Sequence, residues 1–250
     1  MYTQRPLLKN NAKTIVRSSR PSLITAGLIY LAVALLLNTL SSMVLGVNIS
    51  YDDMQRYMRY YMNGNFDAVL RMSEQMMPPS SAHLLNAIIN LVLYIFSAGF
   101  LLFIFNTVKN LGAMYGNLLD GFAIAPKLLG LYLLQALFIF LWSLLLVIPG
   151  IIAAYRYRMA IYLLLDDPER GAMECLRLSK QMMKGHKWEL FVLDLSFIGW
   201  RLLAALPYVG YAVMIWVTPY TETTYVLYYM ALAGKPVIVN PAPTQPPFTM

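Results

Sequence analysis

The sequence predicts an all-α membrane protein in which six transmembrane helices form a bundle and amphipathic helices lie on its cytoplasmic face. Of the 250 residues, 59% are hydrophobic and only 12% are charged, whereas about 25% of the residues in a soluble domain are charged. The apolar residues gather in runs long enough to cross a bilayer. The basic residues flank these runs.

The net charge of +7, from 19 basic and 12 acidic residues, is a second guide to the environment of the chain. A basic protein can bind nucleic acid, but here the basic residues border apolar runs, which favours an anionic membrane surface. We therefore expect a lipid bilayer with anionic headgroups as the partner, and no nucleic acid. The single cysteine, Cys175, excludes an intrachain disulfide and a multi-cysteine metal site.

Residues 1–20 contain five basic residues and no acid, so they are interpreted as a basic cytoplasmic segment. Within it, residues 9–16 are predicted to form a helix on the membrane surface. The first apolar run covers residues 23–47. As a helix it spans ~37 Å, more than the ~30 Å of a hydrocarbon core. The run is too long for the apolar region of a cleaved signal peptide, which has about 7–15 residues.

Residues 48–82 form a polar segment with four acids and three arginines. Asn63-Gly64-Asn65 predicts a turn and Pro78-Pro79 a helix stop. Tyrosine and methionine recur at helical spacing, at Tyr51, Met54, Tyr57, Met58 and Tyr61. This pattern predicts a short amphipathic helix packed on the bundle or on the membrane face; a peptide-binding surface is the alternative.

Five further spans are predicted, and they cover residues 84–108, 128–147, 151–165, 188–206 and 211–232. Pro149-Gly150 is expected to form a tight turn between two of them. Pro219 lies inside the last span and is expected to kink it.

Two connectors between the spans are predicted to be amphipathic. Residues 109–127 contain the G-x-x-x-G pattern of Gly112 and Gly116, but outside an apolar twenty-residue run, so it does not indicate a helix dimer. Residues 168–187 are predicted to form an interfacial helix that is capped by Asp166 or Asp167 and ends at Gly185. A basic or amphipathic stretch thus precedes each pair of spans, which hints at three repeated units.

The orientation follows from the distribution of lysine and arginine. Six spans with the N-terminus inside place 13 of these residues in the cytoplasm and 3 outside, which obeys the positive-inside rule. Treating residues 127–154 as one kinked helix gives five spans with 7 inside and 11 outside, which breaks the rule. The sequence therefore predicts a six-helix membrane domain over residues 21–232 in the inner cell membrane, with both termini cytoplasmic. Residues 233–250 are predicted to be a proline-rich disordered tail.

The second half of the chain contains several distinctive stretches: Pro149 to Ile152, Tyr155 to Ala160, Asp167-Pro168, Ser179 with Met183-Lys184-Gly185, Leu195 to Trp200, Pro219-Tyr220 and Tyr228-Tyr229. In these stretches the chain resembles a bacterial integral-membrane family catalogued as domain of unknown function nine-seven-five. The resemblance is strongest over residues 149–232, and Leu206 to Gly210 departs from it where a more glycine-rich turn is usual. It implies a polytopic inner-membrane protein and supplies no catalytic residues.

Five ionisable residues fall inside the predicted spans: Arg156, Arg158, Asp194, Arg201 and Glu222. A charge at the bilayer centre costs about 2.5–3.5 kcal/mol, so each needs a partner, a cavity or a route to the surface. We expect Arg158 to pair with Asp194 or Glu222. Asp194 and Arg201, seven residues apart, are expected to share a helix face without touching. These charges either fix helix packing, bind a solute or lipid headgroup through the arginines, or relay protons.

Threonines surround the proline of the last span, where their hydroxyls can satisfy freed backbone groups or line a cavity; they are Thr218, Thr221, Thr223 and Thr224. Enzyme signatures are mostly absent from the sequence. Its two histidines, His83 and His186, lie in separate segments, and no H-E-x-x-H, G-x-S-x-G or phosphate-loop motif occurs. We expect no catalytic residue, metal site or cofactor.

The leading hypothesis is a non-enzymatic accessory or scaffold factor of the membrane that acts through lipid or membrane-protein contacts. A small transporter or permease-like component for an anionic or amphiphilic solute is the first alternative. A membrane-embedded enzyme is the second.

Overall fold

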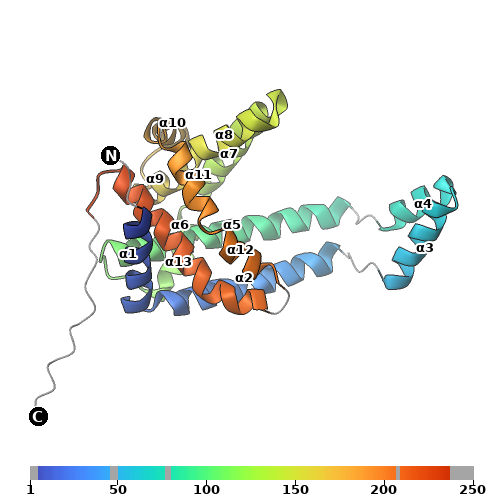
Figure 1. The fold of residues 1–250 in the computed structure, drawn as a ribbon, viewed down its shortest axis with the longest axis horizontal. Helices are drawn as coiled ribbons and strands as arrows, with labels where there is room; N and C mark the ends of the chain where they lie inside the picture. Colours follow the sequence, from blue (N-terminus) through green and yellow to red (C-terminus); the bar gives the residue numbers. More distant parts are fainter. Residues whose placement is uncertain (1–4, 46–49, 77–79, 207–208, 237–250) are drawn as a thin grey trace, which may run out of the picture. The chain divides into compact units, whose positions relative to one another are not determined.

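The computed structural model describes residues 5–45, 50–76, 80–206 and 209–236, and every regular element in these ranges is a helix. The chain divides into two compact units. One comprises residues 1–31 and 95–250, and the other residues 32–94. Figure 1 traces the helices in chain order.

Within the described ranges, four stretches of helix are long and apolar enough to cross a membrane. They are α2 (Leu23–Leu45), α5 (Ser80–Val108), α7 (Ala125–Leu145), and α8 (Val147–Tyr157) continued by α9 (Ala160–Asp166). In α2, the only buried residues among those described are Leu23, Ala26 and Gly27, so most of its apolar side chains are at least partly exposed. A 23-residue helix is ~34 Å long, enough to cross the hydrocarbon core.

The hairpin between α7 and α8 turns at Leu146, which has extended backbone angles (φ −167°, ψ 158°). The predicted turn at Pro149-Gly150 was wrong, because both residues lie in the first turn of α8. A proline is tolerated there, because the backbone N–H groups of the first turn have no hydrogen-bond partner within the helix. Gly150 lets α8 approach α7 closely: a Cβ atom there would lie 2.2 Å from Oγ of Ser143.

Helix α8 and helix α9 are separated by a break at Arg158 and Met159. A serine from α10 (Ala172–Met182) bridges this break, because the buried hydroxyl of Ser179 donates to the carbonyl of Arg156 (2.9 Å) and accepts from the amide of Met159 (3.2 Å). The backbone groups that the break leaves free are thereby satisfied.

Two predicted spans have a different form from the four candidates. The fifth consists of two short helices, α11 (Lys187–Leu195) and α12 (Ile198–Ala204), and the sixth is α13 (Val209–Leu232), with Pro219 inside it. Neither stretch is among the four candidate spans. The count of six spans stays a prediction.

The loop before α10 corrects the predicted helix cap. Helix α10 begins at Ala172 with Gly171 at its N-cap, so neither Asp166 nor Asp167 caps it. Asp166 is instead the last residue of α9. Asp167 accepts the backbone N–H of Glu169 (3.2 Å) in a local turn. In the turn between α10 and α11, Gly185 has φ +87°, a left-handed conformation that favours glycine.

The polar segment of residues 48–82 forms two amphipathic helices, α3 (Tyr51–Met62) and α4 (Phe66–Met76). The predicted turn at residues 63–65 is confirmed, with Gly64 at φ +65°. Oγ of Ser50 caps α3 by accepting the amide of Asp53 (3.1 Å). Pro78 and Pro79 lie outside the described residues. Most of the predicted tyrosine and methionine face is exposed, at Tyr51, Met54, Met58 and Tyr61.

Helix α13 lies at the centre of the larger unit: every residue from Thr223 to Met230 is buried. Helix α1 (Arg5–Ser18) packs against α13 (Figure 1). The predicted N-terminal helix is confirmed, but its apolar face is buried in the protein and is not free to lie on a membrane. That face consists of Leu8, Ala12, Ile15 and Val16.

Candidate functional site

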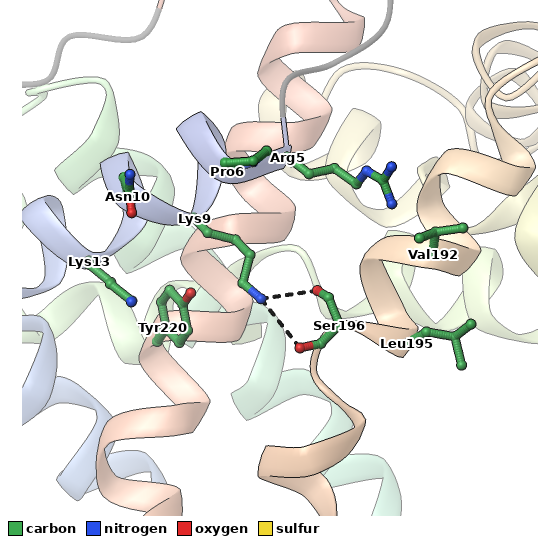
Figure 2. A pocket seen from close by; sticks show the side chains of 9 residues that line it. All are labelled: Arg5, Pro6, Lys9, Asn10, Lys13, Val192, Leu195, Ser196 and Tyr220. Atoms are coloured by element: carbon green, nitrogen blue, oxygen red, sulfur yellow. Dashed lines mark hydrogen bonds between the residues drawn. The ribbon is translucent and has the colours of Figure 1, made fainter.

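An open groove of about 670 Å³ lies where α1 meets α11 and α13, and we call it the basic groove (Figure 2). The residues that line it come from both ends of the sequence. They are Arg5, Pro6, Lys9, Asn10, Lys13, Val192, Leu195, Ser196 and Tyr220. The groove thus combines three cationic side chains with apolar and aromatic walls.

The amphipathic pattern of α1 positions the cations. Because its apolar face packs on α13, the polar positions of the helix turn towards the groove. Lys9 and Lys13 are four residues apart and therefore lie on one side of the helix. The ammonium of Lys9 donates to the carbonyl oxygen (3.3 Å) and to Oγ (3.1 Å) of Ser196, at the break between α11 and α12 (Figure 2).

Three cations of α1 lie over aromatic rings of the larger unit, a geometry in which the ring face attracts positive charge. The distances to the ring centroids are 4.4 Å from Lys9 Nζ to Phe197, 5.8 Å from Lys13 Nζ to Tyr220, and 5.5 Å from Arg17 Cζ to Trp216. The aromatic residues therefore hold the basic face of α1 in place.

The charge of the groove is unbalanced, because none of the residues that line it is acidic. Burial, and then the positive charge of Lys13, lower the pKa of Lys9. A bound anion would offset both effects, since an opposite charge favours the protonated lysine. The arrangement can bind a phosphate or carboxylate group, with Val192 and Leu195 beside an attached apolar chain.

The sequence predicted only a basic N-terminal segment here. Its meeting with Ser196 and Tyr220 depends on the packing of α1 on α13, some 200 residues away in the chain. No local pattern in the sequence signals that contact.

Asp194, one of the five predicted site residues, accepts hydrogen bonds from two tyrosine hydroxyls. Tyr225 donates to its Oδ1 (2.5 Å) and Tyr155 to its Oδ2 (2.9 Å). Nη2 of Arg201 lies 3.9 Å from Oδ1. The expectation that Asp194 and Arg201 would not touch was wrong, because α11 ends at Leu195 and the two residues do not share one straight helix.

The favoured ion pair of Arg158 does not form within the described residues. Its guanidinium makes no ion pair or hydrogen bond there; it lies over the ring of Tyr225, 5.2 Å from the centroid. Glu222 likewise has no hydrogen bond or ion pair in the described ranges, although it interacts electrostatically with Arg158 and Arg201. Arg156 lies over the ring of Trp142 (5.1 Å). Thus Arg158, Asp194 and Arg201 meet around one tyrosine, and Arg156 is held elsewhere.

Threonine hydroxyls near the proline of α13 donate to backbone carbonyl groups three or four residues earlier in the same helix. Oγ1 of Thr221 donates to the carbonyls of Val217 (2.5 Å) and Thr218 (3.1 Å), and Thr224 donates to that of Tyr220 (2.7 Å). The buried hydroxyl of Thr223 has no hydrogen-bond partner among the residues that the structure describes.

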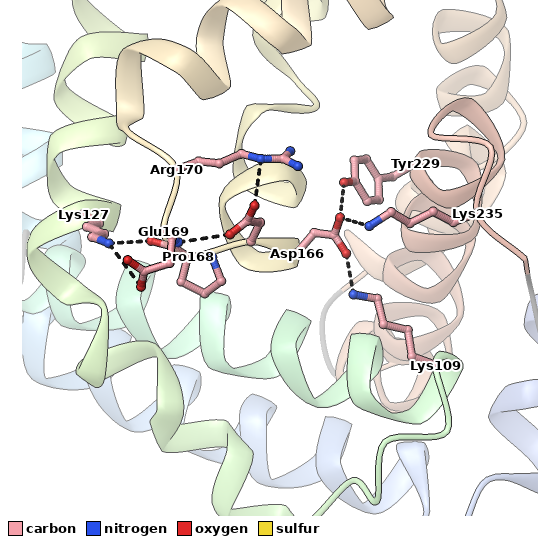
Figure 3. A network of polar contacts seen from close by, with 9 residues as sticks. Lys109, Lys127, Asp166, Pro168, Glu169, Arg170, Tyr229 and Lys235 are labelled. Carbon is pink, nitrogen blue, oxygen red and sulfur yellow. Dashed lines mark hydrogen bonds and ion pairs between the residues drawn. The ribbon is translucent and has the colours of Figure 1, made fainter.

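A second polar network joins the ends of three helices, and the sequence did not identify it (Figure 3). The carboxylate of Asp166, at the end of α9, pairs with Lys109 after α5 and with Lys235 after α13. Tyr229 of α13 donates to the same carboxylate (2.7 Å). The six-span topology places all three helix ends on the cytoplasmic side. This common location is the feature of the sequence that could have indicated the network. Nearby, Lys127 donates to the carbonyl of Pro168 (2.6 Å).

In the parts of the chain that the structure describes, no three His, Cys, Asp or Glu side chains are grouped so as to hold a metal ion. His186 instead contacts Glu189, 2.9 Å away, three residues along the chain.

A family comparison accounts for nearly the whole chain. The family described as Protein of unknown function (DUF975) matches residues 1–235, well beyond the residues that carry the resemblance in the sequence. No curated protein and no solved structure matches the chain. The chain belongs to the DUF975 family of proteins of unknown function.

Proposed function

We propose that this protein is a non-enzymatic component of the inner membrane of a bacterial cell that acts by binding the headgroups of anionic lipids. In this proposal the chain crosses the membrane six times, with both termini in the cytoplasm. The observation that carries the proposal is the basic groove, in which Arg5, Lys9 and Lys13 line a cavity without an acidic residue.

The chemistry of the groove favours a lipid over a free anion. Lys9 and Lys13 supply charges for a phosphate, and Asn10 supplies a hydrogen-bonding amide. Val192 and Leu195 add an apolar wall beside these polar groups. An anionic lipid presents the same two parts, a charged headgroup and an acyl chain, and basic pockets between helices on the cytoplasmic side suit such headgroups.

The predicted topology bears on the cationic side of the groove, which α1 supplies. The positive-inside rule places the N-terminal segment in the cytoplasm, and the cytoplasmic leaflet is the one that carries anionic lipids. Lys180, Lys184 and Lys187 then lie on the same side, which adds to the attraction between this face and the lipids.

The proposal is tested by measuring lipid-dependent stability. The purified full chain is reconstituted in nanodiscs of zwitterionic lipid or in nanodiscs with added phosphatidylglycerol, and its thermal unfolding is compared. We expect the anionic lipid to raise the unfolding temperature. In the double variant Lys9→Gln/Lys13→Gln, we expect that increase to fall by more than half.

The matched control is the double variant Lys180→Gln/Lys184→Gln, which also removes two lysines four residues apart, from exposed positions in and just after α10. It should keep most of the increase. Equal losses in the two double variants would show that only general surface charge matters, and they would contradict a specific headgroup site.

A further inference from the structure

Two helix breaks, at Arg158-Met159 and at Ser196-Phe197, meet around Tyr225 in the larger unit. Pro219 lies six residues before Tyr225 in α13, which continues through it. The ring of Phe197 packs against Tyr220 (5.4 Å between centroids) and against Tyr225 (6.1 Å). Interrupted helices leave backbone groups and side chains free near the middle of a membrane domain, and transporters build solute sites from them.

Two guanidinium groups flank Tyr225. Arg158 lies over its ring face (5.2 Å), and Nη2 of Arg201 donates to its hydroxyl (3.1 Å). Both arginines come from segments predicted to cross the membrane, where an unpaired charge is costly. Such charges mark a functional site unless a structural partner neutralises them.

The charge of Arg201 is neutralised by the protein better than the charge of Arg158. Asp194 lies 3.9 Å from Arg201, and both of its carboxylate oxygens already accept tyrosine hydroxyls. Arg158 is exposed, and its guanidinium makes neither an ion pair nor a hydrogen bond within the described ranges. Its capacity to donate several hydrogen bonds in a planar fork is unused.

Glu222 sets the charge balance of this cluster. It is half-buried and interacts electrostatically with both arginines, but forms no direct ion pair in the described residues. With Glu222 ionised, the two arginines and the two acids, Asp194 and Glu222, sum to zero. Replacing its charge by a neutral amide therefore leaves a net positive site.

We propose that Arg158 and Arg201 form a second binding site, separate from the basic groove, that takes the carboxylate or phosphate group of a small anionic solute. A guanidinium group matches the geometry of such oxyanions because it can bind two oxygens in parallel. Asp194 and Tyr225 are positioning residues that hold Arg201. The buried rings of Phe197 and Tyr220 lie between this site and Lys9 and Lys13 of the groove.

The test uses the full chain in nanodiscs of zwitterionic lipid. Phosphate and succinate are titrated against chloride at matched ionic strength, and the apparent dissociation constant is read from thermal unfolding. We expect stabilisation by at least one of the two oxyanions. Arg158→Gln and Arg201→Gln should each weaken binding by about tenfold or more, the loss of one charge-assisted hydrogen bond. Glu222→Gln should tighten it.

Controls separate this site from the groove. Arg177→Gln, at an exposed arginine of α10, should leave the affinity for soluble oxyanions unchanged. The effects of Arg158→Gln and Glu222→Gln should persist when each is combined with Lys9→Gln/Lys13→Gln, which removes the cations of the groove. If the arginine variants fail to fold, the tightening in Glu222→Gln still tests the proposal, because a merely structural acid would not raise affinity on removal.

Two outcomes decide the source of the anion. Stabilisation by soluble oxyanions that depends on Arg158 supports a solute site. Stabilisation by phosphatidylglycerol alone, still dependent on Arg158, supports the same oxyanion chemistry with a lipid phosphate as the source. The proposal would be overturned if Arg158→Gln and Arg177→Gln bound the anions with the same affinity. It would also be overturned if no anion had an effect and Glu222→Gln did not tighten binding.

Discussion

Tyr225 of α13 donates a 2.5 Å hydrogen bond to Oδ1 of Asp194 in α11. This bond joins a predicted span to a helix that ends one residue later, and it brings Arg201 within 3.9 Å of the same carboxylate oxygen. The connection therefore fixes the break at Ser196-Phe197 relative to α13.

The first prediction concerns this bond. Asp194→Asn and Tyr225→Phe should each destabilise the protein, and the double variant should lose less than the sum of the two. We expect a coupling of about 1 kcal/mol in the free energy of unfolding in detergent, within the range for residues in direct contact. Pairing Asp194→Asn with Tyr211→Phe, at an exposed tyrosine of the same helix, should give additive losses. Additivity for Tyr225 as well would refute the connection.

The second prediction concerns the carboxylate of Asp166, whose side chain is only 1% exposed and pairs with two lysines. Asp166→Asn should cost about 3 kcal/mol of stability, since it removes the buried negative charge that pairs with Lys109 and Lys235 and accepts from Tyr229. Lys235→Ala should cost about 1 kcal/mol or less, because that lysine is 40% exposed. Chemical unfolding in detergent measures both.

The control for Asp166 is Glu169→Gln, the same change of acid to amide at a side chain that is 93% exposed. It should have almost no effect. If Asp166→Asn were as mild as Glu169→Gln, the three helix ends would not be held together by this network.

The third prediction concerns the contact of α5 with the short helix η1 (Tyr115–Leu119). A Cβ atom at Gly99 would lie 2.0 Å from the carbonyl oxygen of Leu118, so Gly99→Ala must displace backbone. We expect a loss of at least about 3 kcal/mol, or failure to fold. Gly130→Ala, in α7 with no atom within 4 Å of the new Cβ, should be neutral or stabilising by up to about 1 kcal/mol. Similar losses at both glycines would contradict the close approach.

The fourth prediction concerns Cys175, which is buried in α10. Burial raises the pKa of its thiol, so the reactive thiolate is scarce at neutral pH. We expect maleimide to modify it on the order of tenfold or more slowly than an exposed cysteine. The reference is Lys180→Cys in a Cys175→Ala background, on the same helix. Denaturant should abolish the difference, and equal rates in the native protein would place Cys175 at the surface.

The long apolar helices could be predicted from the sequence because nothing interrupts them. The starts of α2 and α7 lie within three residues of the predicted starts. An uninterrupted run of about twenty apolar residues defines where the helix lies along the chain. The turn at residues 63–65 was also predictable, because Gly64 supplies the left-handed conformation that the turn requires.

The helix breaks could not be predicted, because they depend on tertiary contacts. Arg158-Met159 and Ser196-Phe197 contain neither proline nor glycine. The first break is satisfied by Ser179, twenty residues on, and the carbonyl of Ser196 is bound by Lys9 from the other end of the chain. For the same reason the sequence identified Asp194 and Arg201 as site residues but not their contact.

The most direct test of a membrane protein with a cytoplasmic basic face is the sidedness of two positions. Single cysteines are introduced as Asn63→Cys, between α3 and α4, and as Lys184→Cys, after α10, in a Cys175→Ala background. Intact cells are treated with a membrane-impermeant maleimide. We expect labelling at position 63 in intact cells, and at position 184 only after the membrane is permeabilised. Labelling of both positions, or of position 184 alone, in intact cells would contradict this topology.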